Sequence, residues 1–192
     1  MDYLIKNVEK YNVSKDYIQF CSNDKVNNCD LNVKYYKNNE FNKRINELCD
    51  ELKVKLEINL SYDKEITKVN NLRNASVLIL CKCFNITNVN ALNNTTILYL
   101  DYNKKVNDVS MLYNIKKLSL WNCNKIKDIG MLRTLESLTI TTKMYGLHLL
   151  KKLKILRIYS KLMKGSMLQE INKLKKINKD LIVDVMTRVY EN

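Results

Sequence analysis

The chain has 192 residues and carries 33 Lys and Arg against 20 Asp and Glu, a formal net charge of +13. Its 46% hydrophobic residues are enough for one core, but no apolar run reaches the ~18 residues that indicate a transmembrane helix. The first residues are too charged for a secretory signal, so we expect a cytoplasmic protein whose six cysteines are free thiols.

Residues 1–51 show no regular repeat and are expected to form an N-terminal cap of irregular coils and a helix. Within them, residues 2–11 favour a short helix. The alternation of apolar and polar residues at 17–20 and 31–35 predicts two short strands. Apolar residues in 39–52 recur at helical spacing, which predicts a helix that caps the first regular coil.

Residues 52–160 repeat one apolar pattern with a period of 20 residues, and the last repeat follows after 18. We number these repeats as coils one to six, starting at Leu52, Leu72, Leu92, Leu112, Leu132 and Leu150. Six and eight positions after each start stand two apolar residues, a spacing that predicts a strand with one buried face. Because one coil cannot bury that face alone, the period predicts a solenoid with a parallel sheet.

Residues 78–86 and 118–126 both read Leu-x-Leu-x-x-Cys-x-x-Ile, which resembles leucine-rich repeats of the short, cysteine-containing type. The resemblance implies an α/β leucine-rich-repeat solenoid, with a curved parallel sheet on its concave face and short turns or 3₁₀ segments on its convex face. It also implies protein binding, because this family mostly binds proteins and has no shared active site. Asp63 and Lys143 depart from the pattern at the Asn/Cys position. The Lys-, Asn-, Ile- and Tyr-rich composition resembles the leucine-rich-repeat gene families of insect poxviruses and other large DNA viruses.

Residues 161–192 are expected to form a C-terminal cap. Apolar residues in 166–178 recur at helical spacing, and Ser166 resembles the first residue of a capping box. The alternation at 181–185 predicts a last strand that closes this end of the sheet.

The outward residues of the predicted strands should form one surface, because neighbouring strands lie ~4.8 Å apart. Exposed aromatic and aliphatic side chains flanked by charges are typical of a protein-binding hot spot, and Trp121, the only tryptophan, is the expected anchor. The same surface also suits a second copy of the chain, or a terminal segment folded over it. The predicted partner-binding residues are Ile79, Tyr99, Asp101, Tyr102, Trp121, Thr139, Arg157 and Tyr159.

Two other binding functions stay open. Residues 141–192 hold 12 basic and 4 acidic residues, which favours nucleic acid or an anionic surface as partner, with exposed aromatic rings as stacking platforms. The same lysines, spread through loops, also serve simply to solubilise the solenoid. A substrate receptor of a ubiquitin ligase is the third alternative, although residues 2–11 lack the Leu-Pro start of an F-box.

Catalysis is not expected. The single histidine, His148, should lie on the outer side of a coil without a nucleophile beside it, and the sequence has no Gly-rich phosphate loop. Cys83 and Cys123 should face the interior as small apolar groups and weak donors, whereas Cys81 should point outward, which does not suit zinc. We therefore expect no enzyme, no cofactor and no metal site.

Overall fold

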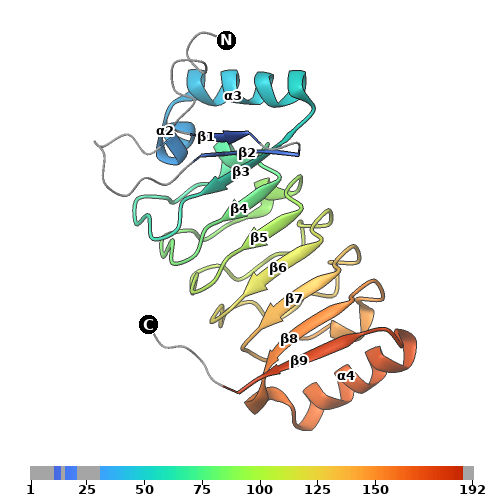
Figure 1. The fold of residues 1–192 in the computed structure, drawn as a ribbon. Coiled ribbons are helices and arrows are strands. Elements are labelled where there is room, and N and C mark those ends of the chain that lie inside the picture. Colours follow the sequence, from blue (N-terminus) through green and yellow to red (C-terminus); the bar gives the residue numbers. More distant parts are fainter. Residues whose placement is uncertain (1–10, 14–15, 21–30, 188–192) are drawn as a thin grey trace.

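The computed structural model of the chain describes residues 11–13, 16–20 and 31–187. Nine strands among them form one sheet in which each strand follows its predecessor in the chain (Figure 1). The first two strands are antiparallel, and the eight strands from β2 onward are parallel. The strands are β1 (Tyr11–Val13), β2 (Tyr17–Phe20), β3 (Lys55–Asn59), β4 (Val77–Ile79), β5 (Ile97–Tyr99), β6 (Lys117–Leu120), β7 (Ser137–Ile140), β8 (Ile155–Tyr159) and β9 (Ile182–Met186).

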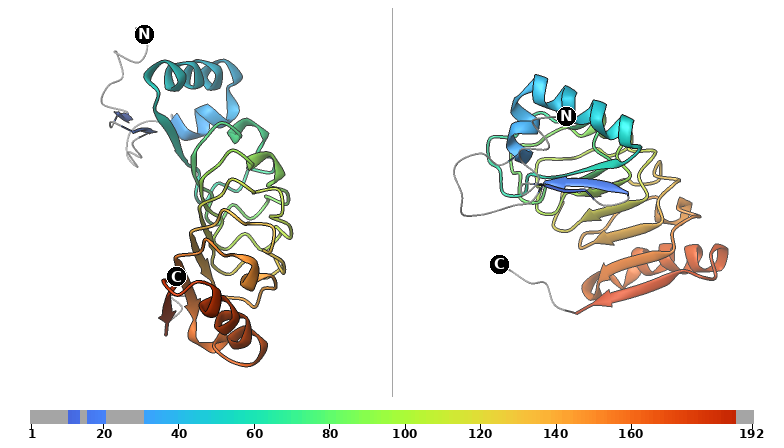
Figure 2. Two further views of the ribbon diagram at one scale, coloured as in Figure 1. Left: turned by 90° about the vertical axis from the view of Figure 1, so that its right-hand side faces the viewer. Right: turned by 45° about the horizontal axis from the view of Figure 1, so that its top comes forward.

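The six repeats stack in register. One inward residue of each strand from β3 to β8 pairs with its counterpart in the next coil, and all six are 0–1% exposed. They are Ile58, Leu78, Leu98, Leu118, Leu138 and Leu156. Figure 2 shows the sheet along one side of the molecule and the return segments along the other. The chain is thus an α/β protein with one open parallel sheet in a solenoid-like arrangement, as the 20-residue period predicts.

In coils two, three and four, a small hydrogen-bond donor in the turn joins the coil to the coil before it. The Cys83 thiol donates to the Leu60 carbonyl over 3.0 Å, and the Cys123 thiol donates to the Leu100 carbonyl over 3.1 Å. At the equivalent position, the Asn103 amide reaches the Leu80 carbonyl over 2.6 Å. Each of these carbonyls also accepts a backbone N–H in its own turn, and the Cys or Asn side chain adds a second bond that comes from the next coil.

Coil five is shorter because two glycines bring its turn against the preceding one. Gly146 has φ +80°, and a Cβ atom there would lie 2.6 Å from the backbone nitrogen of Gly130. Next to this contact, Asp128 and Tyr145 form an isolated parallel bridge. Lys143 is exposed in this coil, whereas Met144 is 1% exposed and fills the interior.

Helices cover both ends of the solenoid (Figure 1). Helices α2 (Leu31–Lys37) and α3 (Asn39–Leu52) lie at the N-terminal end, and α4 (Gly165–Ile177) lies at the C-terminal end. The return segments contain short 3₁₀ turns rather than long helices, as expected. These turns are η2 (Asn70–Leu72), η3 (Asn90–Leu92) and η4 (Leu147–Leu149), with η5 (Ser160–Leu162) after the last coil.

The structure confirms the helix predicted at 39–52 and the strands predicted at 17–20 and near 181–185. The strand predicted at 31–35 is wrong, because this segment is helix α2 with Leu31 and Tyr35 buried four residues apart on one face. The predicted capping box is also wrong: Ser166 lies inside α4, whose N-cap Lys164 makes no side-chain cap bond. The helix predicted at 2–11 falls outside the described residues except for its last position.

Candidate functional site

The outward side chains of the sheet form two parallel columns. Residues at equivalent positions pair across every strand boundary from β3 to β9. The leading column, nearer the strand starts, consists of Glu57, Val77, Ile97, Lys117, Ser137, Ile155 and Ile182. The central column consists of Asn59, Ile79, Tyr99, Ser119, Thr139, Arg157 and Asp184. Four predicted site residues, Ile79, Tyr99, Thr139 and Arg157, therefore lie in one continuous row.

An apolar hollow lies between the two columns at their N-terminal end, with a volume of about 380 Å³. It is lined by Tyr17, Glu57, Val77, Ile79, Ile97 and Tyr99. Val77 points away from the core yet is only 5% exposed, because its neighbours on this face cover it. The sequence predicted Ile79 and Tyr99 but missed Val77 and Ile97, which stand two residues before them and share their face by strand alternation.

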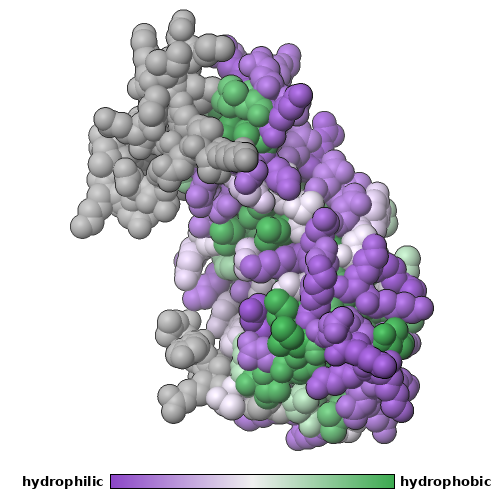
Figure 3. All heavy atoms as spheres, turned by 45° about the vertical axis from the view of Figure 1, so that its right-hand side comes forward, coloured by the Kyte–Doolittle hydropathy of each residue, from purple (hydrophilic) through white to green (hydrophobic). Residues whose placement is uncertain are grey.

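A second hollow of about 360 Å³ adjoins the first, because Tyr17 and Ile97 line both. We call this second hollow the basic hollow. Its other lining residues include four lysines and one carboxylate. They are Lys55, Lys116, Lys117, Lys154, Glu136, Thr96, Ser137 and Ile155. The Lys154 ammonium lies 2.7 Å from the Glu136 carboxylate, and this bond lowers the pKa of Glu136. Figure 3 shows hydrophobic patches separated by hydrophilic side chains.

Lysines also lie over the aromatic rings of this face. The Lys117 ammonium is 5.2 Å from the ring centroid of Tyr99, and the Lys55 ammonium is 5.8 Å from that of Tyr17. Both distances allow a cation–π attraction. One face of each ring is therefore already in contact with a cation of the same chain.

A row of turns follows the strands at their C-terminal ends, and we call it the rim. Tyr62, Lys82, Tyr102 and Asn122 occupy equivalent turn positions there, all with φ between +57° and +68°. A left-handed backbone costs a residue with a side chain about 1–2 kcal/mol. The Lys82 ammonium lies 4.9 Å from the Tyr62 ring and 5.1 Å from the Tyr102 ring, so these side chains form a stack along the rim.

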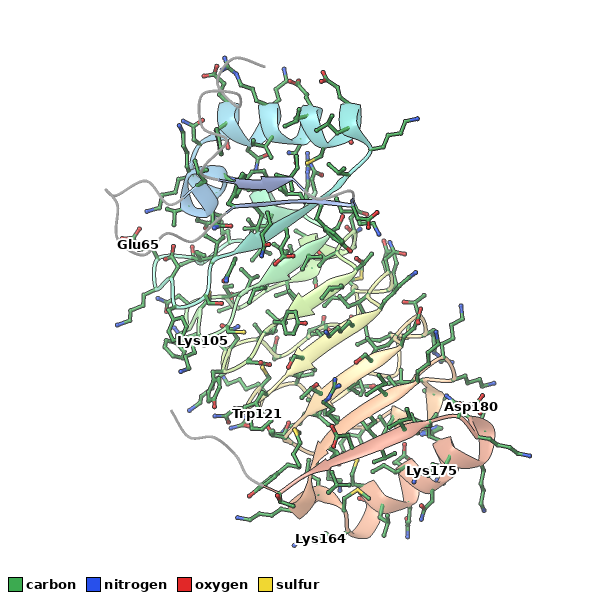
Figure 4. All side chains as sticks on the ribbon, viewed as in Figure 1. Glu65, Lys105, Trp121, Lys164, Lys175 and Asp180 are labelled. Atoms are coloured by element: carbon green, nitrogen blue, oxygen red, sulfur yellow. The ribbon has the colours of Figure 1, made fainter. Side chains whose placement is uncertain are left out.

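Asp101 and Trp121 belong to the rim rather than to the hollows. The Asp101 carboxylate accepts hydrogen bonds from the Ser119 hydroxyl over 2.6 Å and from the Trp121 backbone N–H over 2.9 Å. Burial raises the pKa of Asp101, although these bonds offset part of the effect. Trp121 follows β6 directly and lies near the strand ends (Figure 4). Its indole N–H is buried without a hydrogen-bond partner among the described side chains.

The remaining predicted residues contact groups of their own chain. Arg157 pairs with Asp184 over 3.4 Å, and the Lys161 ammonium lies 5.7 Å from the Tyr159 ring. The backbone N–H of Tyr102 donates to the Trp121 carbonyl over 2.7 Å. The predicted set thus divides into a group beside the apolar hollow, a group along the central column and a group on the rim.

Other chemical groups lie away from these surfaces. His148, in η4, has its Nδ1 2.5 Å from the Glu170 carboxylate of α4, so it joins the last coil to its capping helix. Burial raises the pKa of the Cys83 and Cys123 thiols to about 12.

In residues 11–13, 16–20 and 31–187, no group of three or more His, Cys, Asp or Glu side chains is arranged to hold a metal ion. None of the helices described is both long and apolar enough to cross a membrane.

Comparison of the chain with protein-family models, with curated proteins and with solved structures finds no match.

Proposed function

We propose that this chain is a leucine-rich-repeat protein that binds a protein partner through the outward face of its sheet and catalyses no reaction. The repeat assignment is supported by the 20-residue register of the strands and by the Cys and Asn donors that bond to the preceding coil. Both features agree with the repeat pattern read from the sequence.

The observation that carries the binding proposal is the apolar hollow. Ile79, Ile97 and Tyr99 remain partly exposed, whereas the inward residues Leu78 and Leu98 on the same strands are 0% exposed. Burial of apolar surface is favourable by roughly 25 cal/mol per Å², so a partner that fills this hollow gains affinity. A compact apolar group with a charged border has the composition of a protein-binding hot spot.

A protein fits this face better than a nucleic acid does. Base stacking needs open aromatic rings, but lysine ammoniums lie over Tyr17 and Tyr99. The other residues of the apolar hollow are mainly aliphatic, and aliphatic side chains offer no stacking platform. The lysines of the basic hollow favour an anionic partner.

The test is affinity capture from lysates of the cells in which the protein occurs, with and without nuclease. Three forms are compared: the native chain, an Ile79→Ser/Tyr99→Ser variant, and a Met131→Ser/Tyr113→Ser control. The control removes the same kinds of side chain from exposed positions in return segments, where Met131 is 60% exposed and Tyr113 is 47% exposed.

We expect one protein to be retained by the native chain and the control but lost from the Ile79/Tyr99 variant, whether or not nuclease is present. Retention by all three forms would overturn the proposal. Capture that disappears on nuclease treatment and ignores the Ile79 and Tyr99 changes would favour nucleic-acid binding instead.

A further inference from the structure

We infer that the segment recognised by this face is an extended acidic peptide with one large apolar anchor, lying across the strands from β3 to β8. The inference rests on the proposed function and adds the chemistry of the partner. It follows from the two adjoining hollows, which differ in character but share Tyr17 and Ile97.

Charge is the first step. Among the described residues, four lysines and one glutamate line the basic hollow, and the glutamate already pairs with Lys154. These five side chains together carry three positive charges in excess. Like charges held close together repel one another, and a partner carboxylate relieves that repulsion while it is attracted. An acidic segment is the protein chemistry that complements this lining.

The apolar anchor is the second step. The apolar hollow is lined by Val77, Ile79 and Ile97 with two tyrosine rings, and Glu57 is the one charged side chain among its described lining residues. The Gln19 amide donates to the Glu57 carboxylate over 2.8 Å, so one carboxylate oxygen already has a donor within the chain. A leucine, isoleucine or aromatic side chain suits this lining, and a carboxylate does not.

Length is the third step. Lys55 begins β3, Lys117 begins β6, and Lys154 directly precedes β8. Five strand spacings of ~4.8 Å separate β3 from β8, so the lysines span about 24 Å. An extended chain advances ~3.3 Å per residue, so about seven residues reach from one end to the other. The anchor should lie near the end that crosses β4 and β5, where the apolar hollow is.

The experiment is a selection of phage-displayed random dodecapeptides on the whole chain, followed by anisotropy measurements on synthetic copies of the enriched peptides. Binding is compared between the native chain, a Lys116→Ser/Lys117→Ser variant and a Lys151→Ser/Lys152→Ser control. The control loses the same charge from exposed residues of a return segment. The Ile79→Ser/Tyr99→Ser variant is measured beside them. A labelled single-stranded oligonucleotide of twelve nucleotides is tested as an alternative ligand for each protein.

We expect enriched peptides to combine several Asp or Glu with one large apolar residue. Their binding should weaken about fivefold or more in the Lys116/Lys117 variant and hardly change in the control, because each exposed ion pair contributes up to about a factor of five. Binding should also weaken in the Ile79/Tyr99 variant and at higher salt.

Three results would overturn the inference. Enrichment of uncharged or basic peptides that still need Ile79 and Tyr99 would overturn the acidic partner and leave the proposed function standing. Absence of any peptide that depends on Ile79 and Tyr99 would overturn both. Tighter binding of the oligonucleotide than of every peptide, with dependence on Lys116 and Lys117, would show that the basic hollow binds nucleic acid.

Discussion

Cys83, Asn103 and Cys123 show how one residue position links neighbouring coils. Each side chain is buried, and each donates to the carbonyl of a strand end in the preceding coil. A thiol suits this position because it is small and apolar yet still supplies one weak donor. The amide of Asn103 is larger and donates to two carbonyls, of Leu80 and Leu100.

We expect Cys123→Ala to lower the free energy of unfolding by about 1 kcal/mol, because the buried sulfur and its bond to the Leu100 carbonyl are lost while Asn103 still donates to that carbonyl. Cys123→Ser keeps a donor of similar size and is the matched control, with a smaller expected loss. Urea unfolding followed by circular dichroism measures both. Equal stability of the alanine and serine variants would show that the thiol packs but does not bond.

Gly146 allows the close approach of two turns, and we expect Gly146→Ala to cost about 3 kcal/mol. The cost combines a left-handed backbone, about 1–2 kcal/mol, with a Cβ placed 2.6 Å from the Gly130 nitrogen, an overlap that costs about 1–3 kcal/mol. Gly165→Ala is the control, because its φ is +55° but nothing lies within 4 Å. Urea midpoints that fall equally for the two variants would contradict the steric explanation.

At the scale of elements, helix α4 is held to the last coil by both apolar and polar contacts. Met167, Ile171 and Leu174 are buried, and the helix lies against η4. The Glu170 carboxylate accepts from the His148 ring over 2.5 Å and from the His148 backbone N–H over 3.3 Å. Burial raises the pKa of Glu170, but these bonds and the neighbouring Lys173 outweigh it and hold the pKa below its usual value.

A lowered pKa means that the ionised carboxylate stabilises the fold. Glu170 should contribute fully above the unfolded pKa of about 4.3 and lose its contribution as the pH falls through the lower folded value. We expect Glu170→Gln to reduce stability at pH 7 by about 1–2 kcal/mol and to flatten the loss on acidification.

Thermal unfolding between pH 7 and pH 3 measures this effect. The control is Glu47→Gln, since Glu47 is an exposed carboxylate of α3 that pairs with Lys43 over 3.7 Å. Parallel pH profiles for the native chain and the Glu170 variant would contradict the assigned role of Glu170.

The elements differ in how well the sequence predicts them. Helix α3 is long enough for the helical period to emerge, so residues 39–52 are predicted with the correct bounds. Helix α2 has only seven residues, and in so short a segment Leu31, Val33 and Tyr35 fit strand alternation as well as a helix. Its position is fixed by long-range bonds that a local pattern does not contain, such as the Asn59 N–H donating to the Asn32 amide.

The candidate site was predictable only in part. Strand alternation places Ile79 and Tyr99 on the outward face, because the period of a strand is two. The lysines over Tyr17 and Tyr99 and the shared hollows depend on residues from β2 to β8, which come together only when the coils stack. The hydrogen bonds to Asp101 come from Ser119 and Trp121 of the next coil, so the sequence pattern alone predicts an exposed charge at this position.

At the scale of the whole molecule, each coil contacts mainly its neighbours, so the two end elements determine whether the protein stays monomeric in solution. Ending the chain at Lys164 removes α4 and β9, which uncovers the backbone edge of β8 and the apolar surface under α4. We expect this shortened chain to self-associate, because an open strand edge and exposed apolar surface both favour pairing.

Sedimentation velocity measures the association. The control ends at Thr187 and keeps both α4 and β9. Self-association of the shortened chain alone would agree with a capping role, and a monomeric chain ending at Lys164 would contradict it.

Coils two, three and four have one length and pair in one register. A duplication of 20 codons between residues 72 and 131 would therefore add a whole coil and keep every inward residue inward. Such an insertion lengthens the sheet by ~4.8 Å and leaves both capped ends as they were. Unequal recombination can thus lengthen or shorten the sheet by one coil at a time, without changing the elements that cap its two ends.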